Sequence, residues 1–326
     1  MHLTSKEPSV EVTQGDLLGT LDKEIWTGGI EGHLSLVRTV STVKEPKLRV
    51  LLIHGFAQNR YSWDSPGRSF SDWLALNGLE VWNLELSGHG RSSTTTQKVG
   101  FDNYVEDAVS VIEHFAGDVV LIGHSLGGSV AYAAAGKTGV RGVVGLAAIY
   151  QFGEGNEFVR WLCRLTTAIS PILWSSMRIK TRGAGSLLGR MYGLSDIMGY
   201  TLPMSGWWPG SMEREILADR LELGFDWTNL NVWLDMSRWA SSGEVGFHSD
   251  WVESATPVFA IAGDRDTLAP MSAVRGAYDQ CTSEKRALRE FDLYEDGFHW
   301  GHLDLVLGRE APEIVWPEIL QWVQQL

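Results

Sequence analysis

Cysteine is scarce in this sequence. The 326 residues include only two, Cys163 and Cys281, which are far apart and form no Cys-x-x-Cys spacing. That pattern favours two buried thiols in a reducing compartment over a disulfide. The sequence also lacks an apolar run long enough to span a bilayer, and its N-terminus lacks the apolar core of a secretory signal. We therefore expect a cytoplasmic protein without integral membrane association.

Positive charge is also in short supply. Lysine and arginine total 27 against 40 aspartates and glutamates, so the formal net charge is -13. No basic cluster interrupts this acidic composition, which argues against nucleic acid and anionic membranes as partners. No ligand-spaced His/Cys/Asp cluster and no phosphate-binding loop is present, so no metal or organic cofactor is implied.

The residues that are present indicate an α/β fold. Apolar runs typical of buried parallel strands cover residues 48–53, 79–86, 118–122 and 140–148, and helical patterns cover 69–77, 101–115 and 125–135. Strands that alternate with helices predict βαβ units with right-handed crossovers.

This alternation stops at residues 150–246 and then resumes. A strand is expected at 256–262, a helix within 268–281, a strand at 289–294 and a closing helix at 312–326. We expect a core of residues 1–149 and 247–326, with a mainly helical cap or lid formed by 150–246.

The inserted segment is rich in tryptophan and carries several arginines. We expect most of its tryptophans to form the cap's own small core and a few to line a pocket, with the adjacent Trp207 and Trp208 the strongest candidates. Its arginines are candidates for anchoring a carboxylate, although a solvated surface is the more usual environment; these are Arg182, Arg190 and Arg220.

A possible nucleophile lies between the strand at 118–122 and the helix that follows. Gly123-His124-Ser125-Leu126-Gly127 fits the G-x-S-x-G pattern. A strand-to-helix turn of this kind holds serine in a strained conformation at the carboxyl end of the sheet. We predict Ser125 as the nucleophile; the alternative is a tight structural turn with a buried serine.

A catalytic serine needs a base and an acid, which follow it in the order acid, histidine in this architecture. Asp264 and Asp266 both come after the strand at 256–262. We favour Asp266, which is farther out on the loop, and expect Asp264 to cap the following turn.

The base is expected after the last strand, where Gly297 to Asp304 contains His299 and His302. We prefer His302, because Gly301 before it would permit a close approach to the serine. His299 is the competitor.

Backbone N–H groups are expected to form an oxyanion hole. Leu126 follows the nucleophile, and Phe56, with Ala57 as the alternative, follows the strand at 48–53. His54, in the same loop, is expected to be structural.

Taken together and in this order, these motifs resemble the α/β-hydrolase superfamily of serine hydrolases, with a C-terminal segment similar to acid-lipase-like members. They are His54-Gly55-Phe56, Gly88-His89-Gly90, Gly123 to Gly128, Gly263 to Asp266 and Gly301 to Asp304. The resemblance implies a mostly parallel eight-stranded sheet flanked by helices, with a helical cap inserted after the sixth strand. It also implies that His302 is the base and that His89 belongs to a turn.

Two departures narrow the chemistry that the resemblance implies. A single His-Gly replaces the His-Gly-Gly-Gly of some lipases and esterases, which disfavours bulky tertiary-alcohol esters. Serine, not aspartate, at the nucleophile position disfavours haloalkane dehalogenases and epoxide hydrolases.

We expect a carboxylic-ester hydrolase with a Ser125-His302-Asp266 triad, acting on a small ester with an apolar acyl or alcohol part. The same triad would also serve a thioesterase, acyltransferase, amidase or C–C bond hydrolase. A ligand-binding protein without turnover is the alternative from another class.

Overall fold

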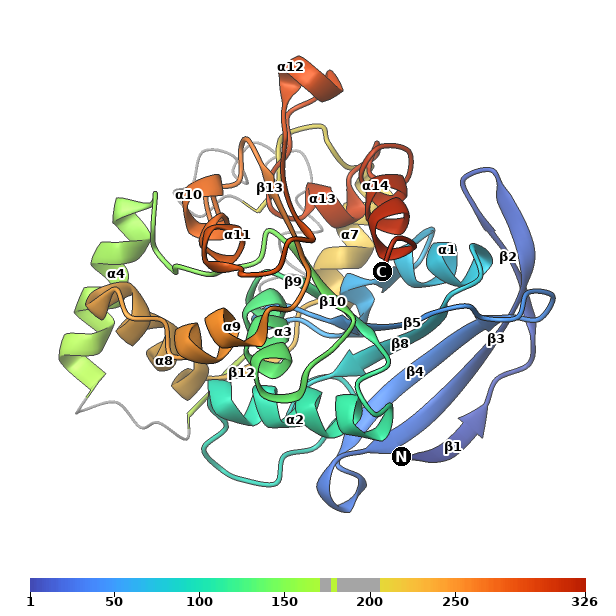
Figure 1. Ribbon diagram of the computed structural model, residues 1–326, viewed down its shortest axis with the longest axis horizontal. Helices are drawn as coiled ribbons and strands as arrows, with labels where there is room; N and C mark the ends of the chain where they lie inside the picture. The colour runs from blue at the N-terminus through green and yellow to red at the C-terminus, as the bar shows by residue number, and fades with distance from the viewer. Residues whose placement is uncertain (171–176, 181–205) are drawn as a thin grey trace.

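A ten-stranded sheet forms the centre of the computed structural model, which describes residues 1–170, 177–180 and 206–326 (Figure 1). Its strand order is β1-β3-β4-β8-β5-β9-β10-β13-β14, with β2 also paired to β3. The strands are β1 (His2–Lys6), β2 (Val10–Gln14), β3 (Leu17–Gly28), β4 (Leu34–Ser41), β5 (Arg49–Ile53), β8 (Glu80–Glu85), β9 (Val120–His124), β10 (Gly142–Leu146), β13 (Val258–Gly263) and β14 (Arg286–Phe291).

The six strands from β8 to β14 are parallel, and this half of the sheet was expected from the sequence. Strands β9, β10 and β13 are buried along their whole length. Such strands read as continuous apolar runs because helices cover both of their faces. The predicted mostly parallel α/β sheet is therefore confirmed.

Helices flank the sheet on both sides. In Figure 1, α2, α3 and α9 lie below the sheet, and α1 and α14 lie above it, near the C-terminus. On the upper side the indole rings of Trp73 in α1 and Trp316 in α14 are 5.6 Å apart. The bounds of these helices are α1 (Phe70–Leu76), α2 (Phe101–His114), α3 (Leu126–Thr138), α9 (His248–Ser254) and α14 (Val315–Val323).

The N-terminal part of the sheet differs from the expected strand-loop-helix rhythm. Strands β1 to β4 form antiparallel pairs, and β4 joins the parallel half through β8. Eight strands make up the expected frame from β3 to β14, and β1 and β2 add two more at the edge of β3. The pattern missed them because β1 is exposed at every residue and so has no apolar periodicity.

Between β10 and β13 the chain is mainly helical in the residues that the structure describes. It contains α4 (Glu157–Ile169), β11 (Arg178–Lys180), α7 (Arg214–Leu223), β12 (Trp227–Asn229), α8 (Leu230–Ser242) and α9. Helices α4 and α8 pack against each other, at the left of Figure 1. We refer to residues 147–257 as the β10–β13 segment.

The C-terminal elements deviate slightly from the predicted ones. Strand β14 begins three residues before the predicted 289, and the helix expected within 268–281 is divided into α10 (Met271–Val274) and α11 (Gly276–Gln280). Short helices α12 (Leu293–Asp296) and α13 (Asp304–Leu307) precede α14. Both cysteines are buried free thiols, as expected.

The tryptophans of the β10–β13 segment do not form one small core. Trp161 is 57% exposed, and Trp239 packs its ring 4.5 Å from that of Phe101 in α2. Trp207 is buried, whereas Trp174 lies outside the described residues. Trp161 and Trp239 are therefore exceptions to the expectation that most of these tryptophans form a core of their own.

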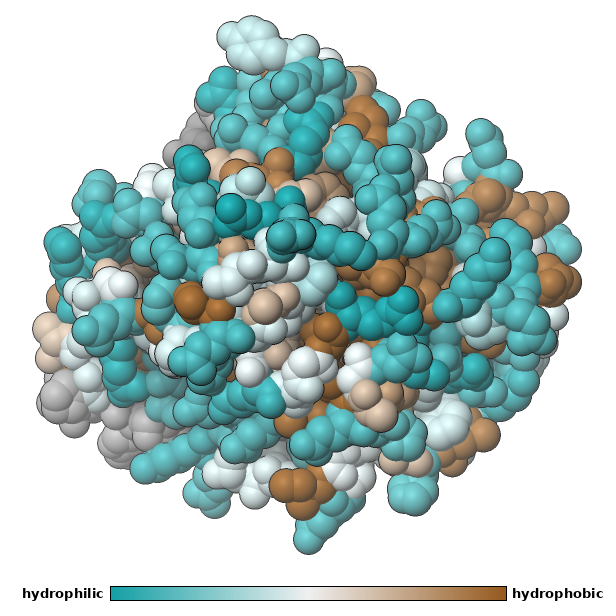
Figure 2. All heavy atoms as spheres, viewed as in Figure 1, coloured by the Kyte–Doolittle hydropathy of each residue, from teal (hydrophilic) through white to brown (hydrophobic). Residues whose placement is uncertain are grey.

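Hydrophilic residues cover most of the face shown in Figure 2, and hydrophobic ones lie between them. Among the helices of the described ranges, none combines the length and the apolarity that crossing a bilayer requires.

Candidate active site

Ser125 occupies a strained turn between β9 and α3. Its φ and ψ are 56° and −124°, a region that residues with a side chain rarely adopt. The turn is held on both sides, because Ser125 N donates to Leu146 O at 3.0 Å and Ile149 N donates to Ser125 O at 3.2 Å. The neighbouring strand β10 therefore fixes the serine at the carboxyl end of the sheet.

Glycines allow the backbone to crowd around this serine. A Cβ on Gly55 would lie 3.0 Å from Ser125 Cβ, and one on Gly123 would lie 2.6 Å from Gly128 Cα. A Cβ on Gly127 would lie 2.5 Å from His54 O. Helix α3 thus begins directly against the end of β5, which is possible only without side chains at these positions.

Asp266 and His302 form a buried pair, as the sequence placed them. Asp266 Oδ2 lies 2.7 Å from His302 Nδ1, and the two residues are only 3% exposed. The other carboxylate oxygen, Oδ1, accepts from Leu268 N and Ala269 N at 2.8 Å each. Asp266 is therefore fixed by its own turn and orients the imidazole.

Asp264 and His299, the alternatives to Asp266 and His302, pair with each other. Asp264 Oδ2 lies 2.5 Å from His299 Nδ1, and Asp264 Oδ1 accepts from Trp300 N at 2.9 Å. The expectation that Asp264 caps the following turn is wrong, because Asp266 accepts those backbone N–H groups. Asp264 instead binds the loop after β14.

The histidine before the nucleophile connects Ser125 to the His302 loop. His124 Nε2 lies 3.0 Å from His302 O, and the two imidazole rings are 4.6 Å apart. Burial, followed by the nearby His302, lowers the pKa of His124 well below its usual value. His124 is therefore a neutral donor that fixes the backbone of the predicted base.

His54 is structural, in agreement with its interpretation from the sequence. Its Nε2 accepts from Leu86 N at 3.1 Å, so the proton is on Nδ1, which donates to Gly55 O at 3.0 Å. Burial, followed by the neighbouring His89, lowers the pKa of His54 to about 3. His89 is likewise occupied, with its Nε2 2.7 Å from the hydroxyl of Tyr104.

The predicted oxyanion donors lie on two elements that meet at Ser125. Leu126 is the first residue of α3, where N–H groups have no intrahelical acceptor. Phe56 follows Gly55 in the loop that passes Ser125, and its ring lies 6.1 Å from that of Trp233 in α8.

The β10–β13 segment contacts the loop of residues 55–58, which we call the oxyanion loop after the role predicted for Phe56. Asp226 N donates to Ala57 O at 2.9 Å, and Phe225 forms an antiparallel bridge with Gln58. The Asp226 carboxylate accepts from Gly90 N at 2.6 Å. Asp226 therefore joins the oxyanion loop, through its backbone N–H, to the turn at Gly88 to Gly90, through its carboxylate.

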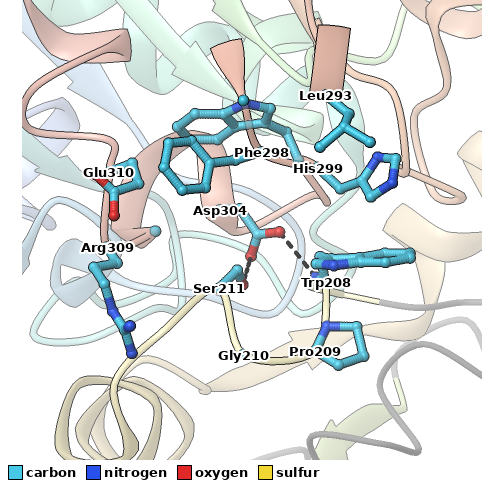
Figure 3. Close-up of a pocket in the computed structure, with 13 residues that line it drawn as sticks. Trp208, Pro209, Gly210, Ser211, Leu293, Phe298, His299, Asp304, Arg309 and Glu310 are labelled. Atoms are coloured by element: carbon cyan, nitrogen blue, oxygen red, sulfur yellow. Dashed lines mark hydrogen bonds between the residues drawn. The ribbon is translucent and has the colours of Figure 1, made fainter.

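A second carboxylate, Asp304, binds the His302 loop to residues 208–211. It accepts from Gly301 N at 2.5 Å and from Trp208 N and Ser211 Oγ at 2.8 Å each (Figure 3). Burial, opposed by these hydrogen bonds, raises the pKa of Asp304 to about 7.

Gly301 permits a close approach, but not to the serine. A Cβ on Gly301 would lie 2.8 Å from Trp207 Cα and 2.9 Å from Asp304 Oδ2. The reason given for preferring His302 is therefore wrong, although the pairing of His302 with Asp266 supports the same choice.

A cavity of about 280 Å³ lies beside Asp304, lined by residues of 208–211 and 293–310 (Figure 3). Trp208 and His299 meet at its rim with ring centres 4.5 Å apart. Trp208 therefore lines a pocket as expected, but the pocket is that of His299 and not of His302.

Arg220 differs most from its predicted environment. It is 1% exposed, so the expectation of a solvated side chain is wrong for this arginine. Arg182 and Arg190 lie outside the described residues.

Sequence reasoning gave no role to Asp304 or Asp226. The Gly-His-Leu-Asp motif contained Asp304, and an aspartate that follows a histidine and is surrounded by apolar residues could have been recognised as a loop anchor. Asp226 had no such signal, because its partners are more than 130 positions away in the sequence.

Solved structures with this arrangement of strands and helices include several lipases and esterases. A monoglyceride lipase from Saccharomyces cerevisiae superimposes with a TM-score of 0.62 at 16% identity, covering 93% of this chain and 96% of that one. A monoacylglycerol lipase from Paleococcus ferrophilus gives 0.58 at 18% identity, covering 90% and 98%. An esterase from Rhodococcus gives 0.55 at 20%, covering 93% and 99%. At these identities the likeness shows the fold.

Curated relatives match a shorter stretch. The 2-succinyl-6-hydroxy-2,4-cyclohexadiene-1-carboxylate synthase of Escherichia coli O9:H4 (strain HS) is 34% identical over 99 residues, which are 29% of this chain and 36% of that protein. The chain thus spans about a third of the length of the curated relatives it matches.

One family model covers most of the chain. The model described as "Alpha/beta hydrolase family" matches residues 50–315, which include the Ser125 turn, the Asp266 loop and the His302 loop. That span includes the parallel half of the sheet except for Arg49, the first residue of β5, and it ends at the first residue of α14. The chain belongs to the alpha/beta hydrolase family.

Proposed function

We propose that this protein hydrolyses carboxylic esters of small molecules through an acyl-enzyme intermediate. The observation that carries the proposal is the buried pair of Asp266 and His302, 2.7 Å apart, in the loops that follow β13 and β14. The lipase and esterase names of the structural neighbours are consistent with this reaction class.

In the proposed reaction, His302 Nε2 removes the proton from the Ser125 hydroxyl as its oxygen attacks the ester carbonyl. The N–H groups of Leu126 and Phe56 stabilise the negative charge on the carbonyl oxygen. The His302 imidazolium then gives its proton to the leaving alcohol, and the acyl group stays on Ser125.

Hydrolysis of the acyl-enzyme follows the same path in reverse. His302 takes a proton from water, the resulting hydroxide attacks the acyl carbonyl, and the proton returns to Ser125 as the acid leaves. Asp266 carries its negative charge next to Nδ1 throughout, which holds the tautomer that exposes Nε2 and stabilises the imidazolium.

Residues 150–246 serve in this proposal as a cap on a core of residues 1–149 and 247–326. The contacts of Phe225 and Asp226 with the oxyanion loop support that assignment, since they attach the segment to the loop that follows β5. Substrate preference would then depend on side chains of this segment.

A second candidate is a non-hydrolytic use of the same three residues. The observation that favours it is the name of the curated relatives, which are synthases of a carboxylate product. Because those relatives match only 99 residues, ester hydrolysis remains the principal proposal.

The experiment compares 4-nitrophenyl esters of increasing acyl length on wild type, Ser125→Ala and two histidine variants. We expect Ser125→Ala and His302→Gln to lose on the order of a thousandfold or more in kcat, whereas His299→Gln keeps activity within about threefold. A fluorophosphonate should label wild type and not Ser125→Ala. Full activity of Ser125→Ala, or equal losses in the two histidine variants, would refute the assignment.

A further inference from the structure

The guanidinium of Arg220 is a buried cation that has no hydrogen-bond acceptor among the described residues. The residue is 1% exposed, and Nε, NH1 and NH2 have no hydrogen-bond acceptor within the described ranges of the chain. A guanidinium carries five donors and is strongly hydrated in the unfolded chain, so an arginine is rarely buried unless an anion meets it.

Two other arginines that are shielded from solvent have carboxylate partners. Arg38 bonds Glu24 and Glu80, and Arg68 bonds Glu213 through two nitrogens, at 2.7 to 3.0 Å. Arg220 is more deeply buried than either and has only an aromatic contact, with Cζ 5.4 Å from the ring centre of Phe225. Arg220 therefore lacks the carboxylate that balances the charge of Arg38 and of Arg68.

The location of Arg220 points to the candidate active site. It lies in the last turn of α7, and a Cβ on Gly224 would lie 2.8 Å from its Cζ. Directly after Gly224, Phe225 bridges Gln58 and Asp226 N donates to Ala57 O in the oxyanion loop. Arg220 is thus only five positions before Phe225, the residue that bridges to the loop passing Ser125.

The charge remains on Arg220 at neutral pH and reaches the site. Burial lowers the pKa of Arg220 to about 10, which still leaves the group protonated. Its charge contributes to the lowered pKa of His54, at the end of β5, and of His124, next to the nucleophile. His54 directly follows β5 and His124 is the last residue of β9, so both lie at the carboxyl edge of the sheet.

We propose that Arg220 binds a carboxylate of the substrate, so that this hydrolase prefers esters that carry a free carboxylate on their acyl part. The inference rests on the proposed function of Ser125 and specifies its substrate class. The planar fork of a guanidinium matches a carboxylate through two parallel hydrogen bonds. One buried positive charge balances a monoanion, which favours a carboxylate over a phosphate dianion.

The test uses 4-nitrophenyl monoesters of adipic and suberic acid beside the same esters with the free carboxylate capped as a methyl ester. Wild type is compared with Arg220→Met, which has a similar length and no charge, and with Arg214→Met, an exposed arginine of the same helix. Adipate itself is added in a thermal unfolding assay, which needs no turnover.

We expect wild type to prefer the free acids over the capped esters. Arg220→Met should lose about tenfold to a hundredfold in kcat/KM on the free acids, the value of a charge-assisted hydrogen bond, and stay within about twofold on the capped esters. Arg214→Met should leave kcat/KM unchanged on both the free acids and the capped esters. Adipate should raise the Tm of wild type but not that of Arg220→Met.

The failures can be distinguished. If Arg220→Met hydrolyses free and capped esters in the same ratio as wild type, the carboxylate site is refuted and ester hydrolysis stands. A second outcome is that wild type cleaves neither ester in a Ser125-dependent way while adipate raises the Tm of wild type and not that of Arg220→Met. In that case the proposed function is refuted and the anion site stands. Should Arg220→Met not fold, Arg220→Lys, which keeps the charge without the fork, must show the loss on free acids alone.

Discussion

Two Asp–His pairs occupy the loops after β13 and β14, and they differ in exposure. The side chains of His302 and Asp266 are 4% and 0% exposed, whereas those of His299 and Asp264 are both 18% exposed. Water screens a charge on the second pair more strongly, so Asp266 is the better placed to stabilise an imidazolium. The sequence placed both candidates of each type but not their pairing, which depends on two loops 35 positions apart.

Exchanging each aspartate for asparagine tests which pair acts in the reaction. Asp266→Asn can still accept from Leu268 N and Ala269 N, so the loop should fold, but it would present an uncharged group to His302. We expect kcat to fall on the order of a thousandfold to ten-thousandfold. Asp264→Asn, measured on the same ester, should retain kcat within about threefold. Equal losses in both variants would contradict this distinction.

Buried histidines also affect stability at acid pH. His54 is neutral in the folded protein, with a pKa lowered from 6.5 to about 3, and the pKa of His124 is shifted in the same direction. The unfolded chain takes up protons at these positions below pH 6.5, and the folded protein does not. Their contribution to stability is therefore complete above about pH 6.5 and is lost as the pH falls toward 3.

Replacing His54 with glutamine should flatten this pH dependence. A glutamine oxygen can accept from Leu86 N, as His54 Nε2 does, but it does not titrate. Between about pH 6 and pH 5, we expect the free energy of unfolding to decrease by up to about 1.4 kcal/mol less per pH unit in His54→Gln than in wild type. Urea unfolding at each pH measures this free energy, and His2→Gln, at an exposed histidine, is the control. Identical slopes in all three proteins would show that His54 does not contribute.

At the scale of elements, prediction succeeded where burial is continuous. Strands β5, β9 and β13 begin and end within two residues of the predicted ranges because each is an apolar run closed by a glycine or histidine. The start of β14 was predicted three residues late, because its first five residues are exposed or only partly buried and form no continuous apolar run. The helix expected at 268–281 is interrupted at Arg275, a boundary without glycine or proline before it to mark it.

Because α3 contacts β5 closely, replacing Gly127 with alanine should destabilise the protein, although this exchange usually stabilises a helix. Alanine is normally favoured over glycine inside a helix by about 1 kcal/mol. At Gly127 the added Cβ would instead lie 2.5 Å from His54 O and 2.8 Å from Ile53 C. We expect Gly127→Ala to lower the free energy of unfolding by about 2–4 kcal/mol and to reduce ester hydrolysis, because α3 must move away from β5.

The matched control for this variant is Gly206→Ala. Within the described part of the chain, a Cβ on Gly206 would meet only Leu303 Cδ1, at 3.8 Å, and the φ of Gly206 is not positive. Chemical denaturation of both variants decides the matter: a Gly127→Ala protein as stable as wild type would mean that α3 and β5 do not approach so closely.

At the scale of the whole molecule, the order of motifs in the sequence was enough to predict the parallel half and the candidate site. Ser125, Asp266 and His302 each follow a strand of that half, so the topology predicts all three at the carboxyl edge of the sheet. The burial of Arg220 could not be predicted in this way, because it results from packing between α7 and the core. The same helix contains one other arginine, Arg214, which is exposed.

The two strands beyond the eight-stranded frame lie at the edge farthest from β13 and β14 in the strand order. Strand β1 is exposed throughout and contacts the rest of the sheet through β3, where Lys6 pairs with Asp22 at 2.7 Å. Exposed ion pairs and edge-strand bonds contribute little to stability. Removing residues 2–9 should therefore lower the Tm by only a few degrees and leave kcat/KM on a 4-nitrophenyl ester within about twofold of wild type.

Since deletion uncovers the edge of β3, the shortened protein should also aggregate more readily, which light scattering would detect. A folded, monodisperse deletion variant that loses most of its activity would instead mean that the N-terminal strands support the site across the whole sheet.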